Sequence, residues 1–303
     1  MEITKVTQTN LFDLPIHKEI CFTTDKNKYS EKIMNQQTKN LKYFSPFLKK
    51  ILDPGEEIFL AVKATSPMAV LEQFTIGWII VYLKRCILIF TSKRILHFPT
   101  RANYSPKLSV SQIRHGDIEK IKLSGFLGRT LIIEYKSGKK EKFYYISSKE
   151  FKKLKTLIPN LATEAHPSEV MERHHLCPKC VTPLQKNVFS CPNCHLEFKN
   201  LKQAIKLSLL FPGGGYFCTN HPVMGIGDAI VETILLIALI STFISAFTVH
   251  ELSMALAAMI PIAFVLSLEK MITIYDTKHF INEYIPVDKN AVAIGSPPQE
   301  IKS

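Results

Sequence analysis

The most informative absence in this sequence is that of lysine and arginine between Lys206 and Lys270, in a chain of 303 residues that carries 38 of them. Two long apolar runs, residues 229–249 and 252–268, occupy this gap. As a helix rising ~1.5 Å per residue, the first run is about 31 Å long, which matches a hydrocarbon core of about 30 Å. The sequence therefore predicts a membrane hairpin, with transmembrane helices at residues 229–249 and 252–273.

The distribution of positive charge around the hairpin predicts its orientation. Basic residues flank both of its ends: Lys199, Lys202, Lys206, Lys270 and Lys278. Because cytoplasmic loops are enriched in lysine and arginine, both ends and the tail of residues 276–303 are expected in the cytoplasm. A shorter apolar piece, residues 203–219, predicts an interfacial or re-entrant helix. The alternative is a broken third span, which would reverse the tail.

A signal peptide and the common catalytic motifs are also missing. The first residues lack a basic stretch followed by an apolar one, so the N-terminal half is expected in the cytoplasm. No G-x-S-x-G, H-E-x-x-H, Walker or G-x-G-x-x-G pattern occurs, and the glycines at 213–215 predict a bend rather than a phosphate cradle. The net charge of +12 fits an anionic membrane surface, and a membrane anchor disfavours nucleic acid as the partner. These observations disfavour an enzyme.

Four of the seven cysteines form two Cys-x-x-Cys pairs, Cys177 with Cys180 and Cys191 with Cys194. Each pair presents two thiolates from one tight turn, and two such knuckles complete a tetrahedral site that usually holds Zn²⁺. Four thiolates leave no open coordination position, so this zinc is expected to be structural. The alternatives are a pair of disulfides, which a reducing cytoplasm disfavours, another metal centre, or a redox dithiol.

The histidines beside this motif and the three other cysteines of the chain give no strong indication of a site. Three histidines adjoin the knuckles and are expected at the surface, with a supporting or replacement ligand role as the alternative: His174, His175 and His195. Three cysteines are isolated and expected to be inert: Cys21, Cys86 and Cys218. The cysteine segment resembles the short zinc-ribbon module of many bacterial membrane proteins. That resemblance covers about twenty residues and implies a metal-stapled clip over residues 174–198, a bacterial inner-membrane location, and no particular activity.

Residues 46–160 predict an antiparallel β domain closed by one helix. Runs of β-forming residues are separated by turn signals and predict strands at residues 57–65, 86–91, 95–100, 118–123, 130–135 and 141–146. Ser147 and Glu150 fit a capping box, and the apolar spacing after them predicts a helix that ends at Pro159. This succession, with an apolar strand running into Thr91, Ser92, Lys93 and Arg94, resembles the bacterial pleckstrin-homology-like domains. The expected fold class is thus a multidomain α+β membrane protein.

Two segments depart from this simple arrangement. Residues 68–83 insert an apolar run with the only tryptophan of the chain, which predicts a buried strand; a membrane-touching element and a transmembrane span are the alternatives. Residues 1–45 are polar and predict an extension that does not pack, apart from a short amphipathic helix over residues 40–52.

Charged residues provide the remaining candidates. Basic residues of the predicted turns could face an anionic lipid surface, or could simply be solvated: Lys93, Arg94, Arg101, Lys107, Lys136, Lys139 and Lys140. Glu232 and Glu269 lie about 18 residues on either side of the hairpin turn and are expected at the same depth, near the membrane–water interface beside Lys270. The alternative for these two carboxylates is an ion- or proton-handling pair.

Together these patterns predict a membrane-anchored adaptor or sensor without enzymatic activity. Its expected partners are a lipid membrane, anionic lipid headgroups and a protein that the sequence does not identify. The alternative is an accessory subunit of a transport or envelope-remodelling complex that acts through its helical hairpin.

Overall fold

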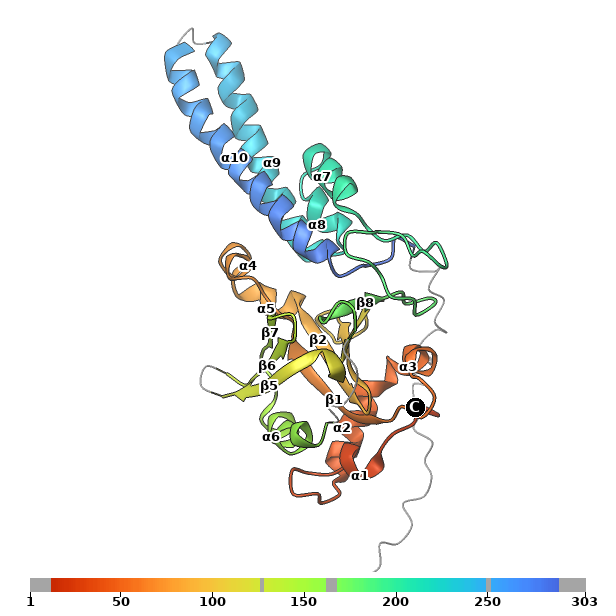
Figure 1. Cartoon of the computed structure of the whole chain (residues 1–303). Helices are drawn as coiled ribbons and strands as arrows, with labels where there is room; N and C mark the ends of the chain where they lie inside the picture. Colours follow the sequence, from red (N-terminus) through yellow and green to blue (C-terminus); the bar gives the residue numbers. More distant parts are fainter. Residues whose placement is uncertain (1–11, 126–127, 162–167, 249–251, 289–303) are drawn as a thin grey trace, which may run out of the picture. The chain divides into compact units, whose positions relative to one another are not determined.

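A computed structural model describes residues 12–125, 128–161, 168–248 and 252–288 (Figure 1). The chain divides into two compact units, one formed by Met1–Leu196 with Asp288–Ser303 and the other by Glu197–Val287. The first unit combines antiparallel sheets with helices, and the second is helical. The α+β class is therefore confirmed.

The larger sheet of the first unit has five antiparallel strands. In spatial order these are β1 (Ile58–Thr65), β2 (Arg85–Thr91), β3 (Arg94–Pro99), β4 (Val110–Arg114) and β8 (His174–Leu176). The first three confirm predicted strands, whereas β4 and β8 were not predicted. Strand β4 escaped prediction because it buries polar side chains, Ser111 and Gln112, where apolar residues would signal a strand.

A second sheet follows directly along the chain. Its strands are β5 (Ile118–Ser124), β6 (Thr130–Tyr135) and β7 (Lys140–Phe143), all antiparallel. Gly138 makes the turn between β6 and β7 at a φ of +85°, a conformation that glycine adopts without a steric penalty. Helix α6 (Ser148–Leu157) comes next, and the Ser147 hydroxyl accepts a hydrogen bond from the Glu150 amide at 3.3 Å. The predicted helix and its Ser147 cap are thus confirmed, although the Glu150 carboxylate accepts from the Ser147 hydroxyl at 2.7 Å.

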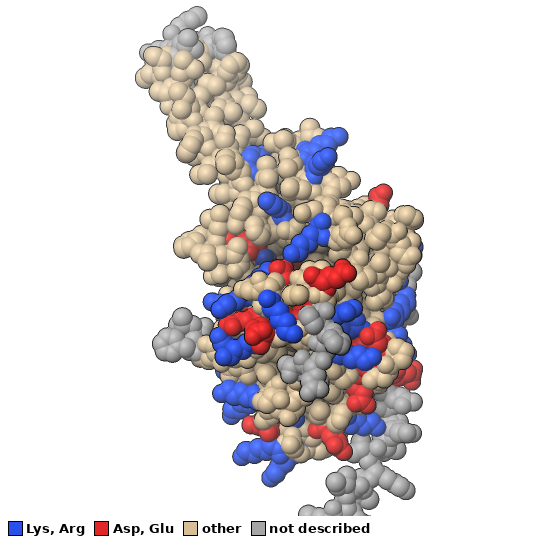
Figure 2. Space-filling view, viewed as in Figure 1, with Lys and Arg blue, Asp and Glu red and all other residues tan. Residues whose placement is uncertain are grey.

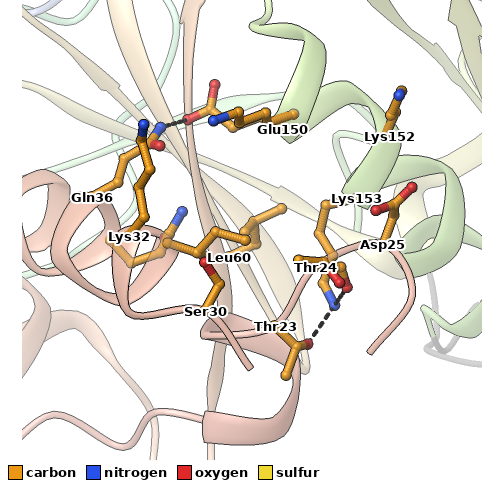
Figure 3. Close-up of a pocket in the computed structure, with 13 residues that line it drawn as sticks. Thr23, Thr24, Asp25, Ser30, Lys32, Gln36, Leu60, Glu150, Lys152 and Lys153 are labelled. Atoms are coloured by element: carbon orange, nitrogen blue, oxygen red, sulfur yellow. Dashed lines mark hydrogen bonds between the residues drawn. The ribbon is translucent and has the colours of Figure 1, made fainter. Parts of the chain in front are cut away.

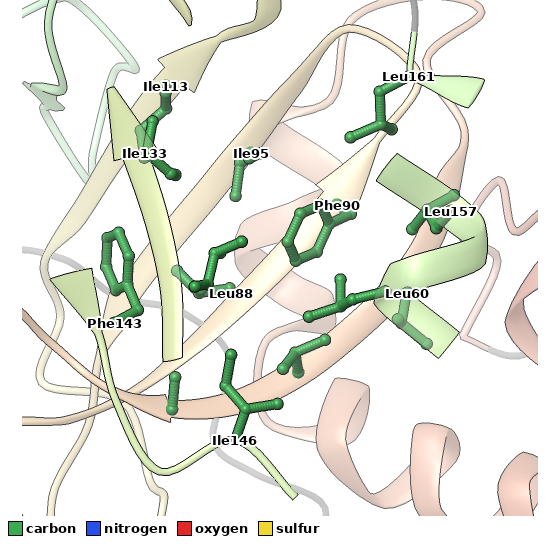
Figure 4. Close-up of a cluster of buried hydrophobic side chains, with 14 of the residues drawn as sticks. Leu60, Leu88, Phe90, Ile95, Ile113, Ile133, Phe143, Ile146, Leu157 and Leu161 are labelled. Carbon is green, nitrogen blue, oxygen red and sulfur yellow. The ribbon is translucent and has the colours of Figure 1, made fainter. Parts of the chain in front are cut away.

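One apolar core joins both sheets to α6 (Figure 4). Leu60 and Phe90 come from the larger sheet, Ile133 and Phe143 from the smaller one, and Leu157 from the helix. Because all of these side chains are buried in a single cluster, the two sheets and the helix form one domain rather than separate layers.

The N-terminal segment is folded, which corrects the expected polar extension. Three helices precede β1: α1 (Lys18–Cys21), α2 (Glu31–Lys42) and α3 (Ser45–Ile51). The single helix expected over residues 40–52 is wrong, since α2 ends and α3 begins within it. Gln37 of α2 shows why a polar residue is buried in this segment. Its side-chain oxygen accepts from the Ala61 amide of the edge strand β1 at 2.8 Å, and its side-chain nitrogen donates to the Ala61 carbonyl at 3.0 Å. The polar side chains thus satisfy a sheet edge that would otherwise stay unpaired.

The second unit is built from four helices. These are α7 (Leu201–Leu210), α8 (Gly214–Cys218), α9 (Pro222–Thr248) and α10 (Leu252–Ile281). Helices α9 and α10 pack against each other, and Pro222–Ala246 and Leu256–Ile281 are long and apolar enough to cross a membrane. On the face shown in Figure 2, the outer half of this hairpin carries no charged side chain among the described residues.

Both hairpin helices are longer than the sequence predicted. With 27 residues at ~1.5 Å each, α9 measures about 40 Å, so it extends past a hydrocarbon core of about 30 Å. Helix α10 continues through Ile281, beyond the predicted end at residue 273. The chain then returns to pair with the segment before α7, where the Val287 amide donates to the Glu197 carbonyl at 3.0 Å. The start of the expected tail is therefore part of this unit, and residues 289–303 lie outside the described residues.

The predicted bend at residues 213–215 lies where α8 begins: Gly213 precedes the helix with a φ of +71°, and Gly214 and Gly215 are its first residues. A Cβ atom on Gly214 would lie 2.1 Å from the Leu207 carbonyl oxygen, and one on Gly215 would lie 2.4 Å from the Ser208 hydroxyl. The backbone is packed too closely here to admit a phosphate. Helix α7, at 10 residues, is too short to span a bilayer.

Candidate metal centre and membrane-facing surfaces

The four predicted cysteines converge on one point. Their sulfur atoms all lie within 4.8 Å of one another. The Cys177 and Cys194 sulfurs are 3.5 Å apart, and those of Cys180 and Cys191 are 3.4 Å apart. A disulfide would require about 2.05 Å, so these contacts are not disulfides. A tetrahedral ZnS₄ centre with bonds of about 2.3 Å places its sulfurs about 3.8 Å apart, so the site fits a metal ion of this size.

Equivalent turns build the two halves of the site. In the first, the Val181 amide donates to the Cys177 carbonyl at 2.8 Å; in the second, the His195 amide donates to the Cys191 carbonyl at 3.1 Å. Val181 and His195 both adopt positive φ values, of 64° and 55°. This conformation is unfavourable for a β-branched residue such as valine, so the fold holds this turn against a local preference.

The metal segment is an extension of the larger sheet rather than a separate clip. Strand β8 ends one residue before Cys177 and pairs with β4. Arg173, just before β8, makes a two-pronged ion pair with Glu141 of β7 at 2.9 and 3.1 Å and donates to Ser111 of β4 at 3.2 Å. Burial alone would raise the pKa of Glu141, but the Arg173 guanidinium outweighs burial and the pKa falls to about 2. The pair is therefore charged at neutral pH, and it fastens the metal segment to both sheets.

The other histidines and cysteines take no part in the metal centre. Within the described residues, the cluster of metal-type ligands here consists of the four cysteines alone. His174 lies on β8, half-buried, with its Nε2 2.6 Å from the Gln112 side-chain amide of β4. Cys21 and Cys86 are fully buried, and burial raises the pKa of Cys21 to about 12 despite the nearby charge of Lys153. Such thiols are protonated and shielded, which is consistent with inert cysteines.

The segment expected as a buried strand, residues 68–83, is instead helical; Ile76 and Ile80 are buried, but five large apolar side chains are exposed. It forms α4 (Val70–Thr75), a 3₁₀ turn at Gly77–Ile79, and α5 (Ile80–Leu83). Val70 is 70% exposed, Phe74 is 81% exposed and Trp78 is 74% exposed, and Leu71 and Tyr82 are also exposed. We call these five residues the apolar surface. A buried strand was wrong because β1 and β2 pair directly with each other, and the inserted residues project from the connection between them (Figure 1).

The apolar surface contains no exposed charge. Glu72 is the only aspartate, glutamate, lysine, arginine or histidine in residues 68–83, and it is completely buried. One of its oxygens lies 2.5 Å from the Lys84 ammonium, and the other accepts the Ala69 amide at the start of α4 at 2.7 Å. The carboxylate thus fixes the base of the helix and is neutralised there. The segment can therefore enter an apolar medium without carrying an unpaired charge into it.

Part of the predicted basic set lies beside the apolar surface. The Lys107 ammonium donates to the Leu83 carbonyl at the end of α5 at 2.9 Å. Arg85, at the start of β2, stacks on Tyr82 and donates to the Ala102 carbonyl, next to the exposed Arg101. We call Arg101 and Lys107, together with Arg85, which was not predicted, the basic rim.

The other predicted basic residues lie elsewhere. Lys93 sits in the turn between β2 and β3, at the far end of β2 from Arg85. Arg94 is wrong as a lipid-facing candidate, because it is 7% exposed and ion-paired with the buried Glu56 at 2.7 Å. Lys139 pairs with Glu172 and Lys140 with Glu134. Of the turn between β6 and β7, Lys136 is exposed.

The two predicted membrane carboxylates come together, as their spacing required. Glu232 of α9 and Glu269 of α10 share a cluster with Asp228, all within 4.8 Å of one another, and Lys270 pairs with Glu232 at 2.6 Å. The side chain of Glu232 is 1% exposed, so it faces the helix pair rather than reaching outward. Asp228 was missed because it precedes the predicted span, whereas α9 begins at Pro222.

Comparisons with known protein families, with curated proteins and with solved structures found no match for this chain. The candidate sites therefore stand on their own geometry: a four-cysteine centre, an exposed apolar surface with a basic rim, and a carboxylate cluster between two apolar helices.

Proposed function

We propose that this protein is a membrane-anchored adaptor or sensor without enzymatic activity, whose cytoplasmic β domain docks on the lipid surface. The apolar surface carries the proposal. Large apolar side chains clustered and exposed on a folded domain indicate an interaction site, and tryptophan and tyrosine are the residues enriched at membrane–water interfaces. The basic rim suits an anionic leaflet at the same place.

The energies favour docking. Burying one large apolar side chain contributes roughly 1.5–3 kcal/mol, and each lysine or arginine near an anionic surface contributes about 1 kcal/mol. The domain is also joined by the chain to the unit that contains the hairpin, since the second unit starts at Glu197 where the first ends at Leu196. Such a tether keeps the domain close to the bilayer, so a modest intrinsic affinity suffices.

A pleckstrin-homology-like fold and a structural zinc belong to this proposal. Four sequential antiparallel strands, three more and a closing helix support the fold, and the convergent cysteines support zinc over other metals. In this interpretation the zinc fixes the end of strand β8 and does no chemistry. Its closed set of four sulfur ligands leaves no position for a substrate.

Replacing Phe74 and Trp78 together with serine is expected to weaken membrane docking. The experiment uses residues 1–196 as a separate protein and vesicles of phosphatidylcholine with phosphatidylglycerol. Loss of two inserted side chains should lower the partition coefficient at least about tenfold. Added salt should weaken binding of the unchanged protein without abolishing it, because the apolar contribution is not screened.

A matched control replaces Tyr29 and Tyr43, two exposed aromatic residues of the N-terminal segment, with serine. This variant should bind vesicles as the unchanged protein does. Neutralising Arg101 and Lys107 should lower binding to anionic vesicles only. Equal losses in the apolar and control variants, or no loss in either, would remove the docking function and favour a protein partner.

The proposed topology places both chain ends in the cytoplasm. Reporters fused at Met1 and after Ser303 should both report cytoplasm, and a cysteine at position 250 should react with an impermeant thiol reagent from outside. The short α7 supports two passes rather than three. A C-terminal reporter on the outer side would show that the segment of α7 and α8 crosses the bilayer.

The carboxylate cluster favours one alternative function, an accessory subunit of a membrane transport or remodelling complex. Ionisable groups held inside a pair of membrane helices commonly mark ion or proton pathways. Changing Asp228, Glu232 and Glu269 one at a time to the corresponding amide would distinguish the two functions. An accessory transport role requires that these variants impair the transport or remodelling activity of the complex. Docking of the β domain should persist in all of them.

A further inference from the structure

A cavity of about 280 Å³ opens between the N-terminal helices and α6 (Figure 3). One wall is α2, the opposite wall is α6, and the loop that joins α1 to α2 closes one side. Leu60 of β1 forms the floor, together with Ile33 of α2. The folded N-terminal segment creates this cavity, which a bare sheet and closing helix would not have.

The charges that line the cavity are unbalanced. Four lysines face two carboxylates: Lys32, Lys149, Lys152 and Lys153, against Asp25 and Glu150. Both oxygens of Glu150 already accept hydrogen bonds, from Gln36 at 3.1 Å and from the Ser147 hydroxyl at 2.7 Å. Burial also raises the pKa of this carboxyl, although Ser147 and Lys63 act in the opposite direction. The lining therefore carries an excess of about two positive charges that internal carboxylates do not balance.

Lys153 differs from the other three lysines in being buried. It is 6% exposed, and its ammonium donates to the Thr23 hydroxyl at 2.8 Å and to the Thr24 carbonyl at 3.0 Å. Within the described residues no carboxylate forms an ion pair with it. An ammonium has three N–H donors, so one remains after these two bonds. Burial is the larger effect and lowers the pKa of Lys153, although the nearby Asp25 carboxylate favours its charged form, so a bound anion would relieve the penalty that remains.

We propose that this cavity binds the phosphate group of a small phosphorylated ligand. A phosphate monoester carries nearly two negative charges at neutral pH, which matches the excess of positive charge, and its three terminal oxygens can accept from several ammonium groups and hydroxyls. Three hydroxyl side chains line the cavity with the lysines: Thr23, Thr24 and Ser30. The apolar floor suits a short carbon skeleton.

The size of the cavity limits the ligand. Its volume lies just below the range of about 300–1,000 Å³ that is usual for ligand pockets, so a phosphorylated sugar or glycerol fits better than a nucleotide. The phosphate could belong to a free metabolite or to a lipid headgroup. This inference is independent of membrane docking, because the cavity and the apolar surface are formed by different elements.

Calorimetry on the full chain in detergent tests the proposal, with glycerol 3-phosphate and glucose 6-phosphate as probes. Glycerol and glucose serve as the matching probes without phosphate. Binding of at least one phosphorylated probe, and of neither matching probe, is expected. Changing Lys32 and Lys152 together to glutamine should raise the dissociation constant about tenfold, since two charge contacts are lost.

A matched variant changes Lys39 and Lys155 to glutamine. These residues lie on the same two helices and are exposed, but they do not line the cavity. They should leave the dissociation constant unchanged. No heat with any phosphorylated probe, or an equal loss in both double variants, would overturn the proposal.

Nanodiscs distinguish the two sources of phosphate. Full chain in discs of phosphatidylcholine is compared with full chain in discs that also contain phosphatidic acid. If the cavity takes a lipid headgroup, phosphatidic acid should weaken the binding of glycerol 3-phosphate. If affinity is the same in both discs, the ligand is a free phosphorylated compound. Loss of vesicle docking in the Phe74 and Trp78 variant should leave the binding of the soluble phosphorylated probes in detergent unchanged, so failure of either proposal can be recognised separately.

Discussion

Replacing Cys177 or Cys194 with serine is expected to release the bound metal ion and unfold the segment around it. Zinc binding to such sites contributes on the order of 10 kcal/mol to folding, because the site exists only in the folded state. Elemental analysis of the purified protein should find one zinc ion per chain, and much less than half of that in each variant. Replacing the isolated Cys218 should change nothing.

The effect should reach beyond the cysteines. Strand β8 ends one residue before Cys177 and covers the outer edge of β4. Hydrogen exchange should therefore speed up in both strands when the metal is removed, while the hairpin of β6 and β7 stays protected. A chain that holds neither zinc nor another metal in its unchanged form would contradict the metal centre.

Replacing Arg94 with leucine is expected to destabilise the β domain by about 3–5 kcal/mol, because the change leaves a buried carboxylate without its partner. Glu56 is completely buried, and Arg94 donates to it from Nε at 3.0 Å and from Nη2 at 2.7 Å. The same guanidinium donates to the Ile51 carbonyl at 2.7 Å, so α3 would lose a contact as well. Urea unfolding of residues 1–196 measures the loss.

Two controls make this prediction specific. Replacing the neighbouring exposed Lys93 with leucine should change stability by less than about 0.5 kcal/mol. Replacing Glu56 and Arg94 together with leucine should recover much of the loss, since no buried charge then stays unpaired. Equal effects of the Lys93 and Arg94 changes would show that the ion pair does not hold the domain.

Acid should weaken the same contact. Burial alone would raise the pKa of Glu56, but the hydrogen bonds from Arg94 and Thr91 outweigh burial and lower it. A carboxyl whose pKa is lower in the folded state stabilises the fold above its unfolded pKa, about 4.3 for glutamate. That contribution is lost as the pH falls below this value. The double variant should therefore show a shallower loss of stability in acid.

Local patterns predicted much of this fold, since alternating apolar residues, turn residues and a helix cap mark most strands and the helix of the β domain. Strand β4 was not predicted, because it buries polar side chains. Gln112 forms a hydrogen bond with Arg94, and Ser111 forms hydrogen bonds with His97 and Arg173. The N-terminal helices were missed for a related reason. Gln37 looks like a solvated residue in the sequence, and only the edge of β1 gives it a buried partner.

The sequence likewise predicted some of the candidate sites and missed others. Cysteine spacing suffices to predict a metal centre, because the ligands lie in two short turns. The shared depth of Glu232 and Glu269 followed from helix length alone. The exposure of the apolar surface did not follow from the sequence, since an apolar run of this length is typical of a buried strand as well. Glu72 is buried and Trp78 is exposed because β1 and β2 pair directly and leave this segment outside the sheet. The sequence alone does not show that pairing.

If the apolar surface lies in the lipid interface, Trp78 reports on it directly because it is the only tryptophan of the chain. The measurement is its fluorescence in the full chain, reconstituted into bilayers of phosphatidylcholine and phosphatidylglycerol with and without brominated acyl chains. We expect emission shifted to shorter wavelength than that of free tryptophan, quenched by the brominated lipid and protected from aqueous iodide. Emission like that of free tryptophan, quenched by iodide and unaffected by bromine, would show that the apolar surface lies in water.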